Sequence, residues 1–520
     1  MGFGVDRMTN ATVARVTGMH DAFSSQVRSY KQVESALTDH FELYGYAPLA
    51  LPVVEYSELY LRKSGEDIVS RMYDFHHRGR RLCLRPEMTA STMRAFIEHM
   101  QDQPLPVRLY YSGPVFRYER PELTSYRQFT QVGLELIGVE GVLADAEVIH
   151  TACSALDSIG IKEYKLVIGH VGILNSFLNS LNIDGQLHSF LLLNMEALRK
   201  QGKAHVAERL GELYPPYHHY SDLSSDNHTS TNNGDSNLIS VLRNMQPGEA
   251  REFVIELLES LNLGLDNSRN RDEVIDRLLA KLRRGDQTAV LNTALQFMTI
   301  LSQLRGEPHT VIAECVNVLE RYRVETPIIQ HLTDLCLALD TFGVNSDRLS
   351  FDLGKNLGFQ YYTGLIFEIH HDSPSIGHHL CGGGRYDDLI SLLGSSQPQP
   401  ATGFSFGLEW VFQALEAEGL SYDSSSHTTQ VLVAGAGSSS AVKVAERVRQ
   451  LGWRTALDLL QRDIHNSLDY AARMQIPWVV IVNQYDSKTV LLKDMFTQAE
   501  FALELEQLPG KLEELGTRYV

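Results

Sequence analysis

The sequence predicts an α+β fold, and three observations lead to that prediction. Strand-like runs joined by polar loops fill roughly the first 170 residues and return after Leu349. Between about 180 and 345 the pattern is helical and rich in Leu, Glu and Arg. After about 430, short apolar runs alternate with helical segments, which is typical of a small α/β domain. A chain of 520 residues has room for two to four domains.

These changes of pattern divide the chain into predicted parts. Residues 1–180 and 346–417 form the two halves of a sheet core, and 181–345 form a helical insertion between them. We expect a disordered loop near 220–237, because that stretch has almost no apolar residues. Residues 418–430 are predicted to be a polar linker, and residues 431–520 to be the final α/β domain.

The core elements follow from periodicity. Residues about 22–46 carry apolar side chains at helical spacing. "PVRLYYSGPVFRYER" and "RQFTQVGLELIGV" predict two long strands joined by a polar loop at Pro121–Ser125. The stretch from Phe351 to His371 alternates as a single buried strand would, with Tyr361 and Tyr362 near its centre.

Composition narrows the class of protein. Forty-six Lys and Arg against 64 Asp and Glu give a net charge of −18, which disfavours non-specific nucleic-acid binding. No apolar run is long enough for a transmembrane helix, and the first residues lack the apolar core of a signal peptide. Five scattered cysteines without a CxxC pair favour a reducing cytoplasm and argue against a cysteine-built zinc site. We therefore expect a cytoplasmic protein with no membrane partner.

Two segments carry candidate ligand-binding groups. In "LRPEMTA", Glu87 and Thr89 follow a strand and begin a helix, where they can hold an ammonium group; alternatively Thr89 only caps the helix. In Gly113–Gly138, Gln131 and Glu135 share one face of a strand, and a buried carboxylate needs a cationic or imidazole partner. The alternative there is a surface hairpin with salt bridges, which explains the arginines but not the inward pair.

Other signals are weaker. "GAGSSS" (Gly435–Ser440) lacks the third glycine of a nucleotide loop and is interpreted as a strand–helix turn. The histidines of "HHDSPSIGHHLCGGG" have no supporting carboxylate pattern, so no metal site is predicted. The glycines of "CGGGRYDDL" predict a tight turn beside the pocket.

The ordered motifs LRPE-T-A, GPVFRYERP, YRQFTQ-G-E-G, YYTG-FE, GGGRYDDL and GFSFGLE resemble those of histidyl-tRNA synthetases, over about 15–170 and 345–510. The resemblance implies a class II synthetase-like antiparallel sheet core flanked by helices, a C-terminal anticodon-binding-like α/β domain, and usually a homodimer. It also implies a histidine pocket. Its residues in this chain are Glu87, Thr89, Arg117, Gln131, Glu135, Tyr361 and Tyr362.

The resemblance fails where the family places arginines. Ser125, Leu357 and Trp410 stand at three such positions, and Gln360 replaces an aspartate. Joining a carboxylate to an ATP phosphate requires cations, so we expect no catalytic residues here, although Lys355 is close enough in sequence to replace one arginine.

Two functions compete, with a third behind them. The favoured hypothesis is a histidine-binding regulatory subunit of ATP phosphoribosyltransferase, acting without a cofactor. It would bind L-histidine and a short-form catalytic subunit, as a homodimer within a larger hetero-oligomer. The alternative is an active, divergent histidine–tRNA ligase that uses ATP and Mg²⁺ and binds tRNA. The C-terminal domain favours the ligase, and the missing arginines favour the regulator. The third possibility is an RNA-binding or stress-sensing paralogue that kept the pocket and the C-terminal domain but has neither activity.

Overall fold

The computed structural model describes residues 13–62, 66–118, 126–181, 183–214, 252–253, 255–256, 288–324, 327–355, 360–420, 429–435, 439–482 and 488–516. The chain divides into two compact units, Met1–Met19 with Leu37–Ala414, and His20–Ala36 with Leu415–Val520. The loop predicted near 220–237 and most of the predicted linker lie outside the described residues.

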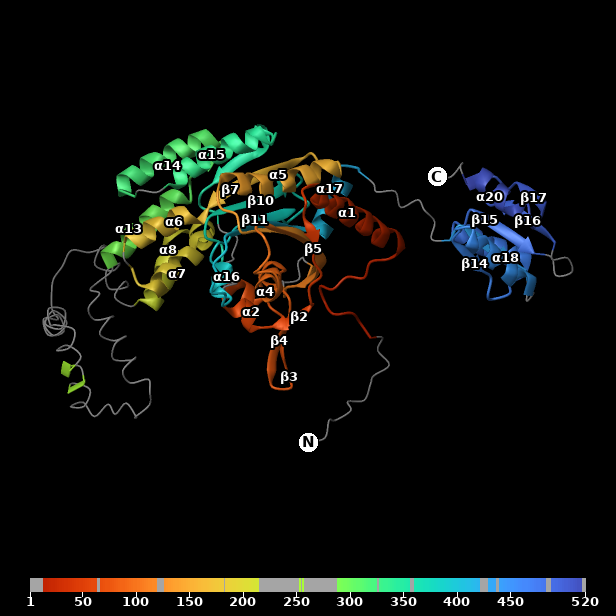
Figure 1. Cartoon of the computed structure of the whole chain (residues 1–520), viewed down its shortest axis with the longest axis horizontal. Coiled ribbons are helices and arrows are strands. Elements are labelled where there is room, and N and C mark those ends of the chain that lie inside the picture. Colours follow the sequence, from red (N-terminus) through yellow and green to blue (C-terminus); the bar gives the residue numbers. More distant parts are fainter. Residues whose placement is uncertain are drawn as a thin grey trace. The chain divides into compact units, whose positions relative to one another are not determined.

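A nine-stranded, mainly antiparallel sheet forms the centre of the first unit (Figure 1). Only the pairs at β1–β5 and β7–β9 are parallel. In spatial order the strands are β1 (Ala47–Pro48), β5 (Val107–Phe116), β6 (Gln128–Ile137), β12 (Ala401–Gly407), β11 (Cys381–Arg385), β10 (Leu365–His371), β7 (Tyr164–His170), β9 (Leu349–Asp352) and β8 (Arg305–Gly306). The two strands predicted from "PVRLYYSGPVFRYER" and "RQFTQVGLELIGV" are β5 and β6, and they pair along their full length.

Helices and a small second sheet pack around this core. Met93 and Phe96 of α4 pack with Val107, Leu109 and Ile137 because these apolar side chains share one face of β5 and β6. Figure 1 shows α5 on the other side of the sheet from α4. The helices are α1 (Ser24–Leu43), α2 (Glu58–Leu61), α3 (Glu66–Ser70), α4 (Thr89–His99), α5 (Val142–Ser158), α16 (Leu389–Leu392) and α17 (Leu408–Ala417), and the small sheet is β2 (Val54–Tyr56), β4 (Arg80–Leu84) and β3 (Asp74–His77).

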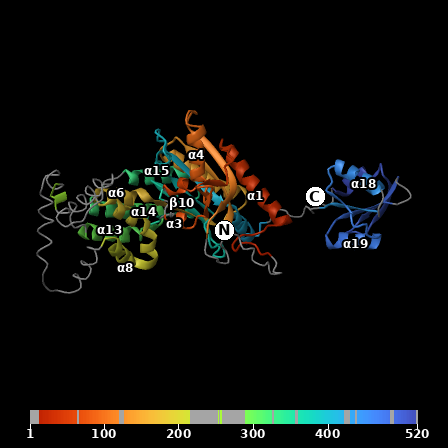
Figure 2. The same cartoon turned by 90° about the horizontal axis from the view of Figure 1, so that it is seen from below.

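The described part of the insertion is helical, as predicted, apart from the short β8. Phe177 stacks on Phe297 with ring centroids 3.9 Å apart, and Tyr322 meets both rings edge-on. These contacts join three helices into one bundle, which Figure 2 shows from below. The described helices of the bundle are α6 (Val171–Ser180), which precedes the insertion, and α7 (Gly185–Leu193), α8 (Met195–Leu213), α13 (Thr288–Leu301), α14 (Pro308–Tyr322) and α15 (Ile328–Thr341) within it.

The prediction of a single strand from Phe351 to His371 is wrong. β9 ends at Asp352 and β10 begins at Leu365, with Tyr361 and Tyr362 between them. The two strands pair with opposite edges of β7, so the chain must cross from one edge to the other and cannot continue straight. Alternation of side chains reports burial on two faces but contains no information about which neighbour a strand pairs with.

The second unit contains a five-stranded sheet with helices packed against it. The order is β14 (Thr455–Leu457), β13 (Val431–Ala434), β15 (Trp478–Val482), β16 (Thr489–Asp494) and β17 (Glu500–Glu504), with the first three parallel and the rest antiparallel. Its helices are α18 (Ser439–Gln450), α19 (Ile464–Arg473) and α20 (Leu508–Gly516). The continuous apolar runs of β13 and β15 fit strands covered on both faces.

Candidate functional site

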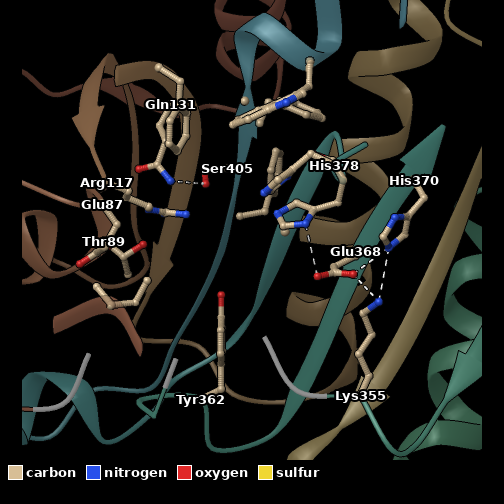
Figure 3. A pocket seen from close by; sticks show the side chains of 18 of the residues that line it. Glu87, Thr89, Arg117, Gln131, Lys355, Tyr362, Glu368, His370, His378 and Ser405 are labelled. Carbon is tan, nitrogen blue, oxygen red and sulfur yellow. Dashed lines mark hydrogen bonds and ion pairs between the residues drawn. The ribbon is translucent and has the colours of Figure 1, made fainter. Parts of the chain in front are cut away.

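A cavity of about 660 Å³ lies among the central strands of the first unit (Figure 3). Six of the seven residues carried over as a histidine pocket line it, and they come from α4, the neighbouring strands and the segment before β10. Glu135 does not line the cavity but is completely buried beside it. The six are Glu87, Thr89, Arg117, Gln131, Tyr361 and Tyr362.

Glu135 is held by two phenols. Tyr111 donates a hydrogen bond to Oε1 at 2.9 Å, and Tyr386 donates to Oε2. A side chain at Gly403, the partner of Glu135 across the strands, would overlap this carboxylate. Burial raises the pKa of Glu135 to about 8, against the opposing effect of these hydrogen bonds. A cation or an imidazole placed nearby would favour the ionised form.

Glu87, rather than Thr89, satisfies the start of α4. Both of its carboxylate oxygens accept from the backbone N–H of Ala90, at 3.1 and 3.2 Å. The N-cap residue Met88 makes no capping hydrogen bond with its side chain. Burial raises the pKa of Glu87 to about 7. Thr89 is therefore not the cap of α4, and two carboxyl groups can ionise near neutral pH here, Glu87 lining the cavity and Glu135 buried beside it.

Gln131 and Arg117 are held in fixed orientations. The amide oxygen of Gln131 accepts from the backbone of Met88 at 3.1 Å, and its amide nitrogen donates to Ser405 at 3.0 Å. Arg117 donates from Nε to the carbonyl of Pro86 at 2.8 Å. In Figure 3 both residues stand on the same side of the cavity as Glu87 and Thr89. We call this side, with Glu135, the acidic wall.

The turn after β11 positions the tyrosines. Arg385 binds the fully buried Asp145 of α5 through Nε at 2.9 Å and Nη2 at 2.7 Å. This anchor sets the direction of the next residue, Tyr386, whose ring lies 5.7 Å from that of Tyr361. Tyr361 in turn lies 4.9 Å from Tyr362. The prediction that the glycines of "CGGGRYDDL" make a tight turn is wrong, because they pair within β11 between β10 and β12. Tyr386, which follows that strand, lines the cavity, and the carry-over from the family missed it.

The opposite side of the cavity is built around Glu368 of β10 (Figure 3). Its carboxylate pairs with Lys355 Nζ, with His370 Nε2 at 2.7 Å and with His379 Nδ1 at 3.4 Å. Burial alone would raise the pKa of Glu368, but His370, His379 and Lys355 together hold it well below the usual range. We call Lys355, Glu368, His370 and His379 the basic wall. Sequence reasoning noted the histidines and Lys355 singly and found no supporting carboxylate, although Glu368 stands only two residues before His370.

Of the three replaced arginines, only the position of Trp410 is described. Trp410 is buried, stacks on His378 with centroids 4.4 Å apart, and meets Phe129 edge-on at 4.8 Å. Its indole Nε1 has no hydrogen-bond partner among the described residues. Gly407 makes room for it, since a Cβ there would overlap the indole ring. Ser125 and Leu357 lie outside the described residues.

The described part of the chain contains no group of three or more His, Cys, Asp or Glu arranged to hold a metal ion. None of its described helices has the length and hydropathy needed to span a membrane.

Solved structures share this fold. A protein of Bacillus halodurans C described as an ATP phosphoribosyltransferase regulatory subunit/histidyl-tRNA synthetase superposes with a TM-score of 0.61 at 22% identity, covering 91% of this chain and 99% of that one. Histidyl-tRNA synthetase from Nostoc sp. PCC 7120 gives 0.60 at 18% identity, covering 97% and 100%. At these identities the likeness concerns the class II synthetase-like fold alone.

Curated relatives overturn the favoured hypothesis. Histidine–tRNA ligase of Thermococcus kodakarensis is 28% identical over 508 residues, covering 96% of this chain and 97% of the relative. That of Archaeoglobus fulgidus is 29% identical over 500 residues, covering 95% and 98%. The interpretation as a regulatory subunit is therefore wrong. The short-form catalytic subunit was expected as a partner only because of that interpretation, so the expectation no longer has a basis. The error came from counting cations at three aligned positions, whereas Arg71, Arg117 and Lys355 line the cavity from other positions.

The family models agree with this correction. The model described as histidyl-tRNA synthetase matches residues 18–215 and 250–411, and the model described as an anticodon binding domain matches 430–515. Together they cover both units and every motif on which the resemblance was based. The chain belongs to the histidyl-tRNA synthetase family.

Proposed function

We propose that this chain is a histidine–tRNA ligase, which activates L-histidine with ATP and transfers it to tRNA. The observation that carries the proposal is the acidic wall, where two buried carboxyl groups, Glu87 and Glu135, adjoin one cavity. An α-ammonium group and an imidazole N–H are both donors, and each needs an acceptor in a buried site. Histidine is the amino acid that presents both.

The first step joins two anions. A carboxylate oxygen of histidine attacks the α-phosphorus of ATP, the bond from that phosphorus to the bridging oxygen breaks, and pyrophosphate leaves with the electron pair. The protein contributes position and positive charge, and Arg117 is placed for both on the acidic wall. Mg²⁺ would enter with the phosphates of ATP, because this ion is usually bound through substrate phosphates.

The second unit supports the tRNA half of the proposal, because residues 430–515 match an anticodon-binding model. With a net charge of −18, tRNA binding has to rest on local contacts instead of overall attraction. Assembly as a homodimer stays a prediction, and light scattering of the purified protein tests it.

Histidine-dependent exchange between ATP and labelled pyrophosphate tests the first step, and charging of tRNA with labelled histidine tests the second. We expect both, with no exchange when another amino acid replaces histidine. Calorimetry in the absence of ATP measures histidine binding separately. Histidine binding without exchange would refute the ligase proposal, and exchange without charging would restrict it to the first step.

A further inference from the structure

The reacting anions need positive charge from both sides of the cavity. Arg117 provides it from the acidic wall, and Figure 3 places Lys355 on the other side of the cavity. Lys355 has a side chain only 17% exposed, so its charge is poorly screened by water. Lys200 also lines the cavity, but its side chain is 70% exposed and pairs with Glu196 on its own helix. Of the two lysines that line this cavity, Lys355 is thus the less exposed.

The backbone fixes where Lys355 emerges. It follows β9 by three residues, and its N–H donates to the carbonyl of Asp352 at 3.1 Å. Gly354 passes so close to Ser302 that a Cβ would meet the Cα of Ser302 at 2.5 Å. Leu353 donates its N–H to the carbonyl of Leu304 at 3.0 Å. The turn is therefore tied to the end of α13, and Lys355 starts from an anchored position.

The side chain is held as firmly as the backbone. Glu368 pairs with the ammonium group, and the Nε2 of His370 lies 3.3 Å from Nζ. An ammonium group has three N–H donors, and the carboxylate of Glu368 takes one of them. His379 contacts the other oxygen of Glu368, so the carboxylate is itself fixed. This arrangement is typical of a positioned cation rather than of a lysine that pairs on the surface.

We propose that Lys355 binds the reacting anions, donating to the α-phosphate as the histidine carboxylate attacks it, and that Glu368 is its positioning residue. The proposal rests on the proposed ligase function and adds the group that supplies charge on the wall opposite Arg117. No proton is transferred by Lys355, which only stabilises the charge that develops on the phosphate oxygens. Because Lys355 stands two residues before Leu357, the chain would obtain this charge from a different position than the family pattern.

The test compares three variants of the full-length protein in the pyrophosphate exchange assay. We expect Lys355→Met to lower kcat about 100-fold, the size of effect seen when one transition-state donor is removed. Histidine affinity by calorimetry should stay within about twofold, because the acidic wall binds the amino acid. Lys355→Arg retains the charge and should stay within about tenfold of wild type. Lys200→Met removes the exposed lysine from the same cavity and should leave kcat unchanged.

The outcomes separate the two proposals. If the wild type catalyses exchange and Lys355→Met retains that activity, the role of Lys355 is overturned and the ligase proposal stays intact. Equal losses in kcat and histidine affinity, or a failure of Lys355→Arg to restore activity, would mean a structural role and also overturn it. Absence of exchange in the wild type removes both proposals together. Thermal unfolding of each variant shows whether a loss reflects misfolding, and in that case Lys355→Gln, which keeps a polar end, replaces Lys355→Met.

Discussion

Two glutamates on strands of the same sheet, β6 and β10 with β12 and β11 between them, behave in opposite ways. Glu135 of β6 is surrounded by phenols and backbone, and burial raises its pKa to about 8. Glu368 of β10 is nearly as buried, with 11% of its side chain exposed, yet its pKa lies well below the usual range. Burial raises the pKa of both carboxyl groups, so the difference comes from the neighbouring side chains. Neutral hydroxyl groups lie beside Glu135, whereas Lys355 and two histidines lie beside Glu368.

The difference between the two pKa shifts indicates different roles: Glu135 is suited to bind a ligand, and Glu368 to hold neighbouring side chains in place. A carboxyl group that stays protonated until a cation arrives can respond to a ligand, whereas a carboxylate already neutralised by its neighbours organises those neighbours. The acidic wall is therefore suited to receive histidine, and the basic wall to present a lysine. The same substitution, Glu to Gln, should consequently have different effects on the two walls.

Glu135→Gln should give the largest effect on binding. A glutamine resembles the protonated acid, so the fold should persist, but it offers no negative charge to the ligand. Loss of one hydrogen bond to a charged group corresponds to about 100-fold weaker histidine binding. Calorimetry measures the affinity, and Glu98→Gln on the exposed end of α4 is the control. Retained affinity would show that Glu135 does not respond to the ligand.

Glu368→Gln should instead cost stability. Its folded pKa is lowered, so the carboxylate stabilises the fold above the ordinary pKa near 4.5, and this contribution is lost as pH falls towards the folded value. We expect about 2 kcal/mol less free energy of unfolding at pH 7, because Lys355 is left buried without its counter-charge. Denaturant titrations at pH 7, pH 4 and pH 2.5 measure it. Because the folded pKa lies well below the usual range, the gap to wild type should change little between pH 7 and pH 4 and should narrow at pH 2.5. An equal gap at all three would contradict the assignment.

Histidine binding should release protons. The raised pKa values of Glu87 and Glu135, about 7 and about 8, mean that the free protein holds protons there at pH 6.5. A bound ammonium or imidazole N–H favours ionisation, so up to about two protons should leave. Calorimetry in buffers of different ionisation enthalpy counts them. The release should fade by pH 9 and shrink in Glu135→Gln; proton uptake would reverse the proposed role of the acidic wall.

Trp410→Phe should give the smallest effect. Phenylalanine keeps an aromatic ring against His378 and Phe129, and the lost indole N–H has no partner among the described residues. The free energy of unfolding should change by less than about 1 kcal/mol. Trp410→Ala empties a buried site and should cost about 3–5 kcal/mol. Denaturant titration compares the two, and a large loss in Trp410→Phe would reveal a role for the nitrogen.

Much of the fold was predictable, because periodicity is local. The pairing of β5 with β6 and the helical insertion follow directly from apolar spacing. The break between β9 and β10 was not predictable, since both strands flank β7 and only strand order reveals the crossing. Glu135 was predicted to face inward from its spacing with Gln131. Its partners Tyr111 and Tyr386 come from β5 and the turn after β11, which no spacing connects.

The sequence by itself determined the family, the strand and helix content, and most residues of the acidic wall, because these depend on short motifs. The arrangement of charged groups in the site was decided only by the tertiary structure. Position-by-position reasoning found arginines missing and concluded that chemistry was lost, whereas the fold brings Lys355, Glu368 and His379 together from three separate segments. Electrostatic energy depends on distance in space, so a cation count along the chain cannot substitute for the geometry of the cavity.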